Sequence, residues 1–268
     1  SKRLMADDTG VSVITVEHAY SLLDEEGYIE ARERSGYFVS YHEEDTVHME
    51  IRPVHQPVRM EVDKEALDFP FAKYAGTMRR IITRYGTQIL SRSPASGVAE
   101  LQEAIAVYLR QVRGIEAAPE QIVIGAGAEY LYSLIVQMLG RDLRYALEDP
   151  SYDKIRKVYE ANGASCDSLI MGENGILTRE LERTRATILH VTPFHSFPSG
   201  ITASASKRAE YIRWAVKRNG IIVEDDYDSE FRFATRPLPS LQGMSGANGP
   251  VVYLTTFSKS LAPGMRIA

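Results

Sequence analysis

The sequence predicts an α/β fold with a mainly parallel, doubly wound sheet, preceded by a small module of helices. Short, mainly apolar runs at 187–191, 221–223 and 251–255 predict buried strands, and a helical segment at 206–218 separates the first two. Strands separated by helices at this spacing favour a parallel sheet with ligand loops at the carboxyl ends of the strands. Polar residues follow each run directly, so we expect a ligand site there.

The composition is typical of a folded chain with a substantial core. It has 268 residues, of which 44% are hydrophobic, and no apolar run of about 18 residues predicts a membrane helix. No signal-peptide pattern precedes the charged start. The single cysteine, Cys166, cannot form an internal disulfide, which favours a reducing cytoplasm. The net charge of −5 argues against a general polyanion-binding surface, so any DNA contact must be local.

The first 40 residues predict two short helices and a two-stranded hairpin. A helical pattern starts at Leu4, and Ser12 caps a second helix that runs to about Glu26. In residues 28–39 apolar and polar side chains alternate on either side of a turn, as in a two-stranded wing. The amino end of the second helix suits entry into a DNA major groove. The candidate DNA-contacting residues are Lys2, Arg3, Ser12, Val13, Thr15, His18, Arg32 and Arg34.

Charge disfavours DNA binding by this segment. Residues 1–40 hold four basic and eight acidic side chains, whereas neutralisation of phosphates supplies most nonspecific DNA affinity. A small helical cap on an enzyme therefore remains the alternative. Residues 41–67 show no sustained periodicity of hydrophobic residues, which predicts a linker. The six- and seven-residue spacing of its three histidines predicts no metal site.

The last predicted strand leads into a turn that carries Lys259. A lysine delivered onto small and hydroxyl-bearing residues suits a desolvated amine that forms an imine with an aldehyde, and Thr256, Ser258 and Arg266 are candidates to hold a phosphate. A surface lysine at the end of a strand is the alternative. Upstream, residues 121–130 predict a short strand that runs through small residues into a helix, whose free N–H groups suit a phosphate.

The strand that starts at Ile221 ends in four carboxylates within five residues, from Glu224 to Asp228. A carboxylate beneath a protonated pyridine nitrogen keeps that nitrogen charged, as pyridoxal phosphate requires. We expect the remaining carboxylates to order the loop or to pair with arginines such as Arg232.

These motifs resemble a known family. The order of EDDYDSEF (224–231) and TFSKSLAPGMR (256–266), about thirty residues apart, resembles the aminotransferase-like domain of MocR-type regulators in the GntR superfamily. GVSVITVEHAYSLLDEEGYIEARERSGYFVS (10–40) is similar to the GntR winged helix-turn-helix. TPFHSFPSG (192–200) resembles the family's TPSHQ(F/Y)P(T/S)G, with departures at Phe194 and Ser196.

The resemblance implies a partial winged helix-turn-helix at 1–40, a linker at 41–67, and at 68–268 part of the large domain of a fold-type I aminotransferase that depends on pyridoxal phosphate. The chain is then expected to be truncated at both ends. The implied cofactor residues are Lys259 as the covalent attachment point, Gly127, Ala128 and Glu129 in the phosphate-binding turn, Tyr152 over the ring, Asp225 at the ring nitrogen, Tyr227 at the phenolic oxygen, His195 near that oxygen, and Thr256, Ser258 and Arg266 at the phosphate. The alternative for Tyr152 is that it only packs in the core. The alternative for His195 is a supporting role outside the site.

We therefore predict a DNA-binding transcriptional regulator that senses pyridoxal phosphate or an amino compound through aldimine exchange at Lys259. The resemblance implies a cytoplasmic homodimer, and Lys154 and Arg156 are weaker candidates for binding an effector's carboxylate. The alternative function is that of an active class I/II aminotransferase, which transfers an amino group between an amino acid and a 2-oxo acid. A lyase or decarboxylase of the same fold type has no separate signal in the sequence.

Overall fold

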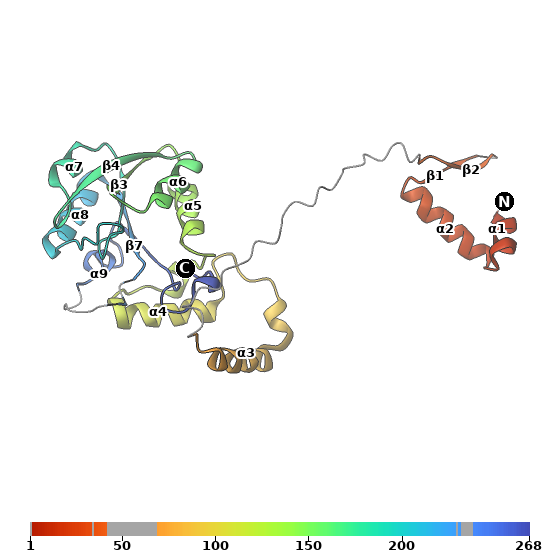
Figure 1. Cartoon of the computed structure of the whole chain (residues 1–268), viewed down its shortest axis with the longest axis horizontal. Coiled ribbons are helices and arrows are strands. Elements are labelled where there is room, and N and C mark those ends of the chain that lie inside the picture. The colour runs from red at the N-terminus through yellow and green to blue at the C-terminus, as the bar shows by residue number, and fades with distance from the viewer. Residues whose placement is uncertain (1, 34, 42–68, 229, 232–237) are drawn as a thin grey trace. The chain divides into compact units, whose positions relative to one another are not determined.

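The computed structural model describes residues 2–33, 35–41, 69–228, 230–231 and 238–268 (Figure 1). The chain forms two compact units, Ser1–Val62 and Asp63–Ala268. Three sequence predictions lie outside the described residues: Arg34 as a DNA contact, the linker from residue 42 onward with its histidines, and Arg232 as an ion-pair partner.

The smaller unit contains two helices and a hairpin. Their bounds are α1 Lys2–Thr9, α2 Val13–Glu25, β1 Ile29–Arg32 and β2 Gly36–Val39. The Ser12 hydroxyl accepts a hydrogen bond from the Thr15 backbone N–H at 3.1 Å and so caps α2, as predicted. The antiparallel hairpin pairs Ile29 with Val39, and the predicted order of two helices and a wing is found.

The larger unit is built on a six-stranded sheet of order β5-β4-β3-β6-β7-β8. The strands are β3 Arg144–Asp149, β4 Ser165–Gly172, β5 Gly175–Ile176, β6 Ile188–Val191, β7 Ile221–Asp226 and β8 Val251–Thr255. Every pair is parallel except β4 with β5. All four residues of β6 are buried, as expected for a strand covered on both faces. The predicted mainly parallel α/β fold is confirmed.

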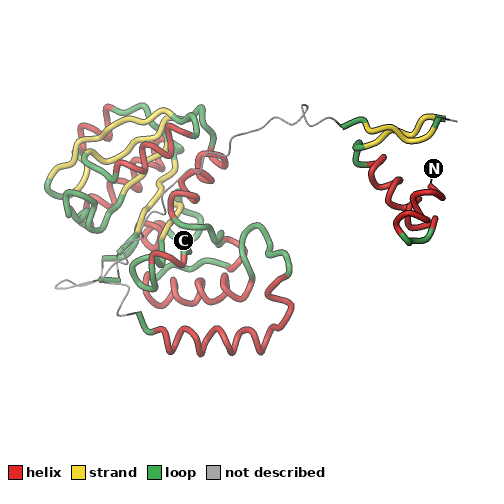
Figure 2. Tube along the Cα trace, turned by 45° about the vertical axis from the view of Figure 1, so that its right-hand side comes forward, coloured by secondary structure: helices red, strands yellow, loops and turns green. Residues whose placement is uncertain are grey.

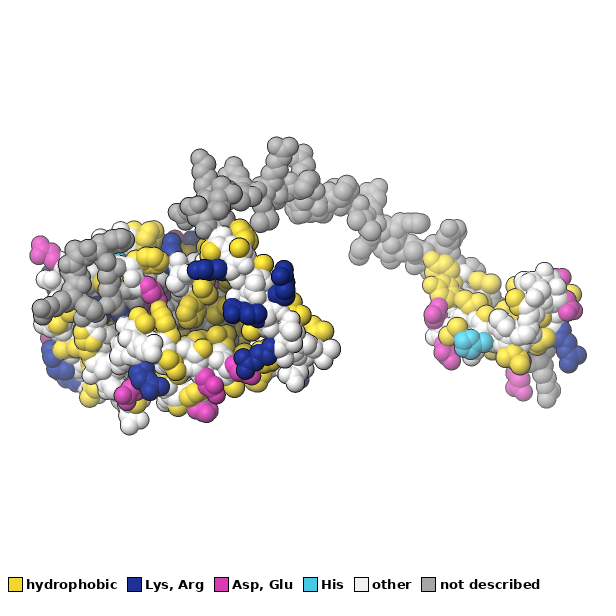
Figure 3. Space-filling view, turned by 90° about the horizontal axis from the view of Figure 1, so that it is seen from below, with side chains coloured by type: hydrophobic (Ala, Val, Ile, Leu, Met, Phe, Trp, Pro, Cys, Tyr) yellow, Lys and Arg dark blue, Asp and Glu magenta, His cyan; other side chains and the backbone are white. Residues whose placement is uncertain are grey.

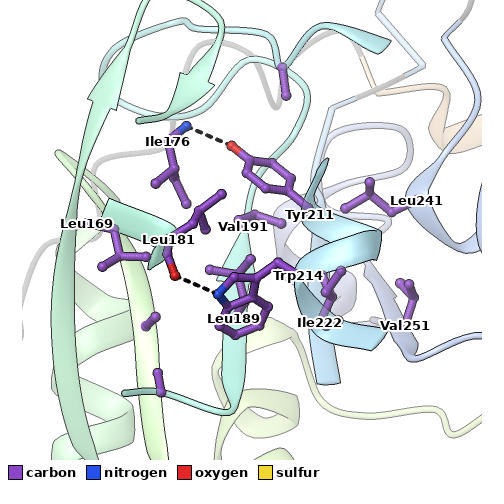
Figure 4. Close-up of a cluster of buried hydrophobic side chains, with 14 residues drawn as sticks. Leu169, Ile176, Leu181, Leu189, Val191, Tyr211, Trp214, Ile222, Leu241 and Val251 are labelled. Atoms are coloured by element: carbon purple, nitrogen blue, oxygen red, sulfur yellow. Dashed lines mark hydrogen bonds between the residues drawn. The ribbon is translucent and has the colours of Figure 1, made fainter. Parts of the chain in front are cut away.

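Helices cover both faces of this sheet (Figures 1 and 2). The helices of the larger unit are α3 Phe71–Tyr85, η3 Gly86–Leu90, α4 Ala99–Arg113, η4 Pro119–Gln121, α5 Ala128–Leu139, α6 Asp153–Ala161, α7 Thr178–Arg183, α8 Ala205–Arg218, α9 Leu241–Ser245 and η5 Pro263–Met265. On one face, α7, α8 and α9 pack a core in which the Trp214 indole donates to the Leu181 carbonyl at 2.9 Å (Figure 4). On the other face, Tyr132 of α5 and Tyr159 of α6 pack against the strands, beside Tyr145 of β3.

The strand order reverses direction between β3 and β6. From β3 the chain passes through α6 to β4 on one side, whereas from β6 it passes through α8 to β7 on the other. In open α/β sheets the crevice at such a switch point, outside the carboxyl ends of the strands, is where ligands bind. The segments after β3, β6, β7 and β8 contain most of the predicted cofactor residues; Asp225 lies in β7 itself, and Gly127, Ala128 and Glu129 lie at the start of α5.

Residues 121–125 do not form the strand that the sequence predicted for them. The segment opens with the short helix η4, and Gly125 exchanges two backbone hydrogen bonds with Ala268, at 2.9 and 3.1 Å. Such an exchange is typical of antiparallel pairing, but it joins only one residue pair here. A strand requires a longer ladder of such bonds, which the described residues do not supply.

Helix α3 exposes its apolar side. None of its residues is buried, although Phe71, Met78 and Ile82 belong to one helical stripe. Viewed from below in Figure 3, the larger unit shows hydrophobic side chains at its surface beside a group of Lys and Arg side chains. Within the described part of the chain, no helix combines the length and apolarity needed to span a bilayer.

Candidate functional site

The amino end of α5 forms a cradle with Arg266. Gly127 precedes the helix with φ of +98°, a conformation that favours glycine. A Cβ at this position would meet the Arg266 guanidinium at 2.8 Å, so Arg266 lies directly against the turn. Ala128 and Glu129 are the first helical residues, and the first N–H groups of a helix have no partner within it. The turn and the guanidinium together suit an anion such as a phosphate.

The turn after β8 presents the other two phosphate candidates. The hydroxyls of Thr256 and Ser258 lie 2.8 Å apart, and the Ser258 backbone N–H donates to Thr256 Oγ1 at 3.2 Å. Lys259 follows in the same turn and is exposed, which contradicts the expectation of a desolvated amine. The reason is its position: it lies beyond the last residue of β8, outside the layers that bury the sheet.

Asp225 lies at the end of β7 within a chain of buried polar side chains. Its Oδ2 accepts a hydrogen bond from the Tyr132 hydroxyl, and His190 Nε2 lies 3.5 Å from the same oxygen. His190 Nδ1 is in turn 2.7 Å from the Tyr159 hydroxyl. Burial, reinforced by the Asp225 charge, raises the pKa of both phenols, so they stay neutral hydrogen-bond donors. Sequence reasoning identified Asp225 and missed Tyr132, His190 and Tyr159.

Asp226, the neighbour of Asp225, points to a different set of partners. Arg113 Nη2 lies 2.6 Å from its Oδ2, and the Tyr253 hydroxyl donates to the same atom at 2.6 Å. Only 4% of the Arg113 side chain and 2% of the Asp226 side chain are exposed. The predicted pairing of the loop carboxylates with an arginine is thus found for Asp226, although its partner comes from α4.

Tyr152 and its neighbours line the loop after β3. Tyr152 is 38% exposed, which disfavours the core-packing alternative, and its ring meets Phe197 edge-on with centroids 6.0 Å apart. Lys154 Nζ lies 2.8 Å from Glu129 Oε1 and 5.9 Å from the centre of the Tyr152 ring. The ion pair joins the first turn of α6 to the amino end of α5, so Tyr152, which directly precedes α6, lies near the predicted phosphate turn.

His195 and Tyr227 are brought together by the loops after β6 and β7. The Tyr227 hydroxyl donates to the His195 carbonyl at 2.7 Å, and His195 Nδ1 lies 3.4 Å from Asp228 Oδ2. Burial, with a smaller contribution from Asp228, raises the pKa of Tyr227 to about 12. Both predicted residues therefore lie at the carboxyl edge of the sheet, with the Tyr227 hydroxyl held by the backbone of His195.

Glu148 ties the end of β3 to the loop after β6, at the switch point. Its Oε2 accepts a hydrogen bond from the Ser196 hydroxyl at 2.7 Å and another from the Thr192 backbone N–H at 3.2 Å. Burial raises the pKa of this carboxyl to about 8, so it is largely protonated at neutral pH. The sequence signal for this role was Ser196, which departs from the family pattern, but its partner on β3 was not predicted.

The predicted DNA contacts in the smaller unit fall into two groups. Arg3, Val13, Thr15 and His18 are exposed. Three more of the described candidates already have partners within the unit. Lys2 lies 3.1 Å from Glu17, Arg32 lies 3.2 Å from Glu30, and the Ser12 hydroxyl caps α2. Among the residues that the structure describes, no group of His, Cys, Asp and Glu side chains has the arrangement of a metal site.

Comparison with known proteins assigns the larger unit to a family. The sequence profile described as "Aminotransferase class I and II" matches residues 72–268. The chain belongs to this family. Among solved structures, an α-aminoadipate aminotransferase, LysN from Thermus thermophilus, complexed with N-(5'-phosphopyridoxyl)-L-leucine, is 29% identical to it. That likeness has a TM-score of 0.66 and covers 74% of this chain and 51% of LysN.

The similarity to regulators covers the whole chain. It is 36% identical over 280 residues to the uncharacterized HTH-type transcriptional regulator YdeL of Bacillus subtilis, and 31% identical over 291 residues to the probable rhizopine catabolism regulatory protein MocR of Rhizobium meliloti. These matches cover 100% and 99% of this chain, but only 60% and 59% of the relatives. The resemblance to MocR-type regulators is confirmed, and the chain spans about three fifths of those proteins.

Proposed function

We propose that this protein is a transcriptional regulator that binds DNA through residues 1–40 and pyridoxal phosphate through residues 68–268, joined by a linker at 41–67. The observation that carries the proposal is the similarity of the entire chain to HTH-type regulators, while residues 72–268 match the aminotransferase family. An enzyme alone would not require the smaller unit. We further propose that it acts as a homodimer in the cytoplasm, where an amino compound is the effector.

The residues of the larger unit fit pyridoxal phosphate. The Gly127 turn and Arg266 offer N–H groups and a guanidinium to the phosphate, because no side chain at Gly127 fills the space between them. Asp225 offers a buried carboxylate to the ring nitrogen. When bound, this cofactor supplies an aldehyde that amines attack and a ring that withdraws electrons. Lys259 offers the amine for covalent attachment, and its exposure leaves that amine accessible to competing amino compounds.

Coupling between the two units follows from differential binding. An effector that displaces the Lys259 amine changes the contacts that the turn after β8 makes. A ligand shifts a conformational equilibrium only when it binds the two conformations with unequal affinity. We therefore expect the amine to alter DNA affinity only when the cofactor is present. The exposed Arg3 and the amino end of α2 are proposed to contact the DNA.

The decisive test is binding of the protein to the DNA upstream of its own gene, by fluorescence anisotropy with and without pyridoxal phosphate. We expect specific binding whose affinity changes with the cofactor, and loss of that change in Lys259→Ala. Arg3→Ala should lower the slope of log affinity against log salt concentration by about one, because one phosphate contact is lost. Lys73→Ala removes an exposed positive charge from the larger unit and should leave the slope unchanged.

A second candidate function is a working aminotransferase, favoured by the similarity to LysN. The two functions share the cofactor residues, so the site itself does not separate them. Steady turnover of an amino donor and a 2-oxo acid, together with cofactor uptake but no specific DNA binding, would favour the enzyme. The excess of acidic residues in the smaller unit would then be explained without DNA.

Replacement of Gly127 by Ala should weaken pyridoxal phosphate binding about tenfold or more. The added Cβ strains a backbone with φ of +98° and presses on the Arg266 guanidinium. Gly140→Ala is the matched control, because Gly140 lies at the other end of α5 with φ of +115° and carries similar strain. Titration of the cofactor's absorbance measures both affinities. Equal weakening in both variants would show that strain alone, and not the cradle, causes the loss.

A further inference from the structure

One of the two carboxylate oxygens of Asp225 faces two other side chains. Tyr132 donates to Oδ2, and His190 Nε2 approaches the same atom at 3.5 Å. A carboxylate has acceptor sites on both oxygens, so Oδ1 remains for a ligand. The donors come from different elements, α5 and β6, and all the side chains involved are buried.

Tyr132 and Tyr159, the two phenols among these polar side chains, show which atoms donate the hydrogen bonds. Tyr132 can only donate to a carboxylate, and the pKa of Tyr159 is raised by burial and then by the Asp225 charge, so each phenol keeps its proton. With the His190 Nε2 proton facing Asp225, Nδ1 accepts from Tyr159 at 2.7 Å. The Tyr132 hydroxyl therefore donates directly to Asp225 Oδ2, and the His190 Nε2 proton faces the same oxygen from 3.5 Å. Both draw negative charge from that oxygen, the hydrogen bond more strongly.

Tyr132 also connects the carboxylate to the phosphate cradle. It lies on α5, the helix whose amino end carries the Gly127 turn, and its ring meets the His190 ring edge-on at 5.4 Å. A single rigid helix therefore positions both the phosphate-binding end and the hydroxyl that holds Asp225.

We propose that Tyr132 is a positioning residue that fixes Asp225 with Oδ1 toward the cofactor's ring nitrogen and weakens the carboxylate's hold on the proton of that nitrogen. The inference rests on the proposed binding of pyridoxal phosphate. A weaker hold leaves the ring less electron-withdrawing, which favours reversible binding of amino compounds over their chemical conversion.

The test is the pH titration of the ring nitrogen in the protein loaded with ¹⁵N-labelled pyridoxal phosphate, followed by NMR. Tyr132→Phe keeps the ring and removes the hydroxyl, so the midpoint should rise by about one pH unit, a tenfold tighter hold on the proton. Other titratable groups near Asp225 are common to both proteins and cancel in the comparison. They are Glu148 on β3, Tyr159 on α6, His190 on β6, and Asp226 and Tyr227 on its own segment.

Tyr145→Phe is the matched control. Tyr145 is buried in the same core, but its hydroxyl donates to the Gly140 carbonyl at 3.0 Å and takes no part in the chain. Its loss should leave the midpoint unchanged. Tyr159→Phe should raise the midpoint by less than Tyr132→Phe, because it removes the donor behind His190, and it provides a second test if Tyr132→Phe does not fold.

The outcomes separate this inference from the proposed function. Bound cofactor with the same midpoint in the unsubstituted protein, in Tyr132→Phe and in Tyr159→Phe would overturn the role of Tyr132 alone. An equal rise in Tyr145→Phe would also overturn it, because the shift would then reflect general loosening of the core. Failure of the unsubstituted protein to bind the cofactor would overturn both proposals.

Discussion

Replacement of Arg113 by Ala should lower the free energy of unfolding by about 3–5 kcal/mol, because it leaves the Asp226 carboxylate buried without its cation. The pair is joined at 2.6 Å, with 4% and 2% of the two side chains exposed. Burial is the largest single influence and lowers the pKa of Arg113, but Asp226, Tyr253 and Glu224 together outweigh it, so the net shift is upward. Urea unfolding followed by the fluorescence of Trp214, the single tryptophan, measures the loss in the larger unit.

Arg110→Ala provides the control for this substitution. Arg110 lies on the same helix, one turn earlier, and is exposed, so its loss should change the free energy of unfolding by no more than about 0.5 kcal/mol. If Arg113→Ala and Arg110→Ala unfolded at the same urea concentration, the buried pair would have no special role in stability. A smaller loss in the Arg113→Ala, Asp226→Asn double variant would show that the unpaired charge causes the damage.

Stability should fall as the pH rises from about 5 to about 8, with Glu148 as a main cause. Burial raises the pKa of Glu148 to about 8, so over this range the folded protein binds a proton that the unfolded chain has released. The unfolded state binds fewer protons, and the free energy of unfolding therefore decreases with pH, by at most about 1.4 kcal/mol per pH unit from this group. Glu224, whose pKa burial raises to about 7, adds to the decrease below that pH.

Glu148→Gln should flatten this dependence. The amide stays neutral at every pH, and its carbonyl oxygen can still accept from Ser196 and the Thr192 N–H. Glu100→Gln, at an exposed position in the first turn of α4, should leave the dependence as it is. Urea unfolding at pH 5.5 and pH 8 gives the comparison. An unchanged difference in Glu148→Gln would place the titrating group elsewhere.

The cofactor residues show what local sequence chemistry can predict. Small residues before a helix predicted a turn with free N–H groups, and the family resemblance put Gly127 in it; the structure shows Gly127 at the start of α5, against Arg266. Asp225 was expected at the end of a buried strand and is found there. The burial of Lys259 was predicted wrongly, since exposure depends on how far the strand extends and on what covers the turn.

The partners of the buried polar groups were beyond sequence reasoning. Tyr132 has the helical spacing of a core residue, and the one clue to a further role is that a buried phenol usually finds a hydrogen-bond partner. Its partner, Asp225, is 93 residues away along the chain. Arg113 lies in the last turn of a helix, where a basic residue is favoured by the helix dipole. The sequence therefore offered a sufficient reason for an arginine there without a partner such as Asp226.

By itself, the sequence predicted the two helices and hairpin at the amino end, the strands β6, β7 and β8 of a mainly parallel sheet, and the positions of the chemical motifs along the chain. These depend on periodicity and on residues close together in the chain, which act before tertiary contacts form. Only the tertiary structure decided that Tyr132 and His190 lie against Asp225, that Arg113 neutralises Asp226, and that Glu148 joins β3 to the loop after β6. Each of these choices depends on which elements pack together, because a buried polar group takes its partner from whatever folding brings within hydrogen-bond distance.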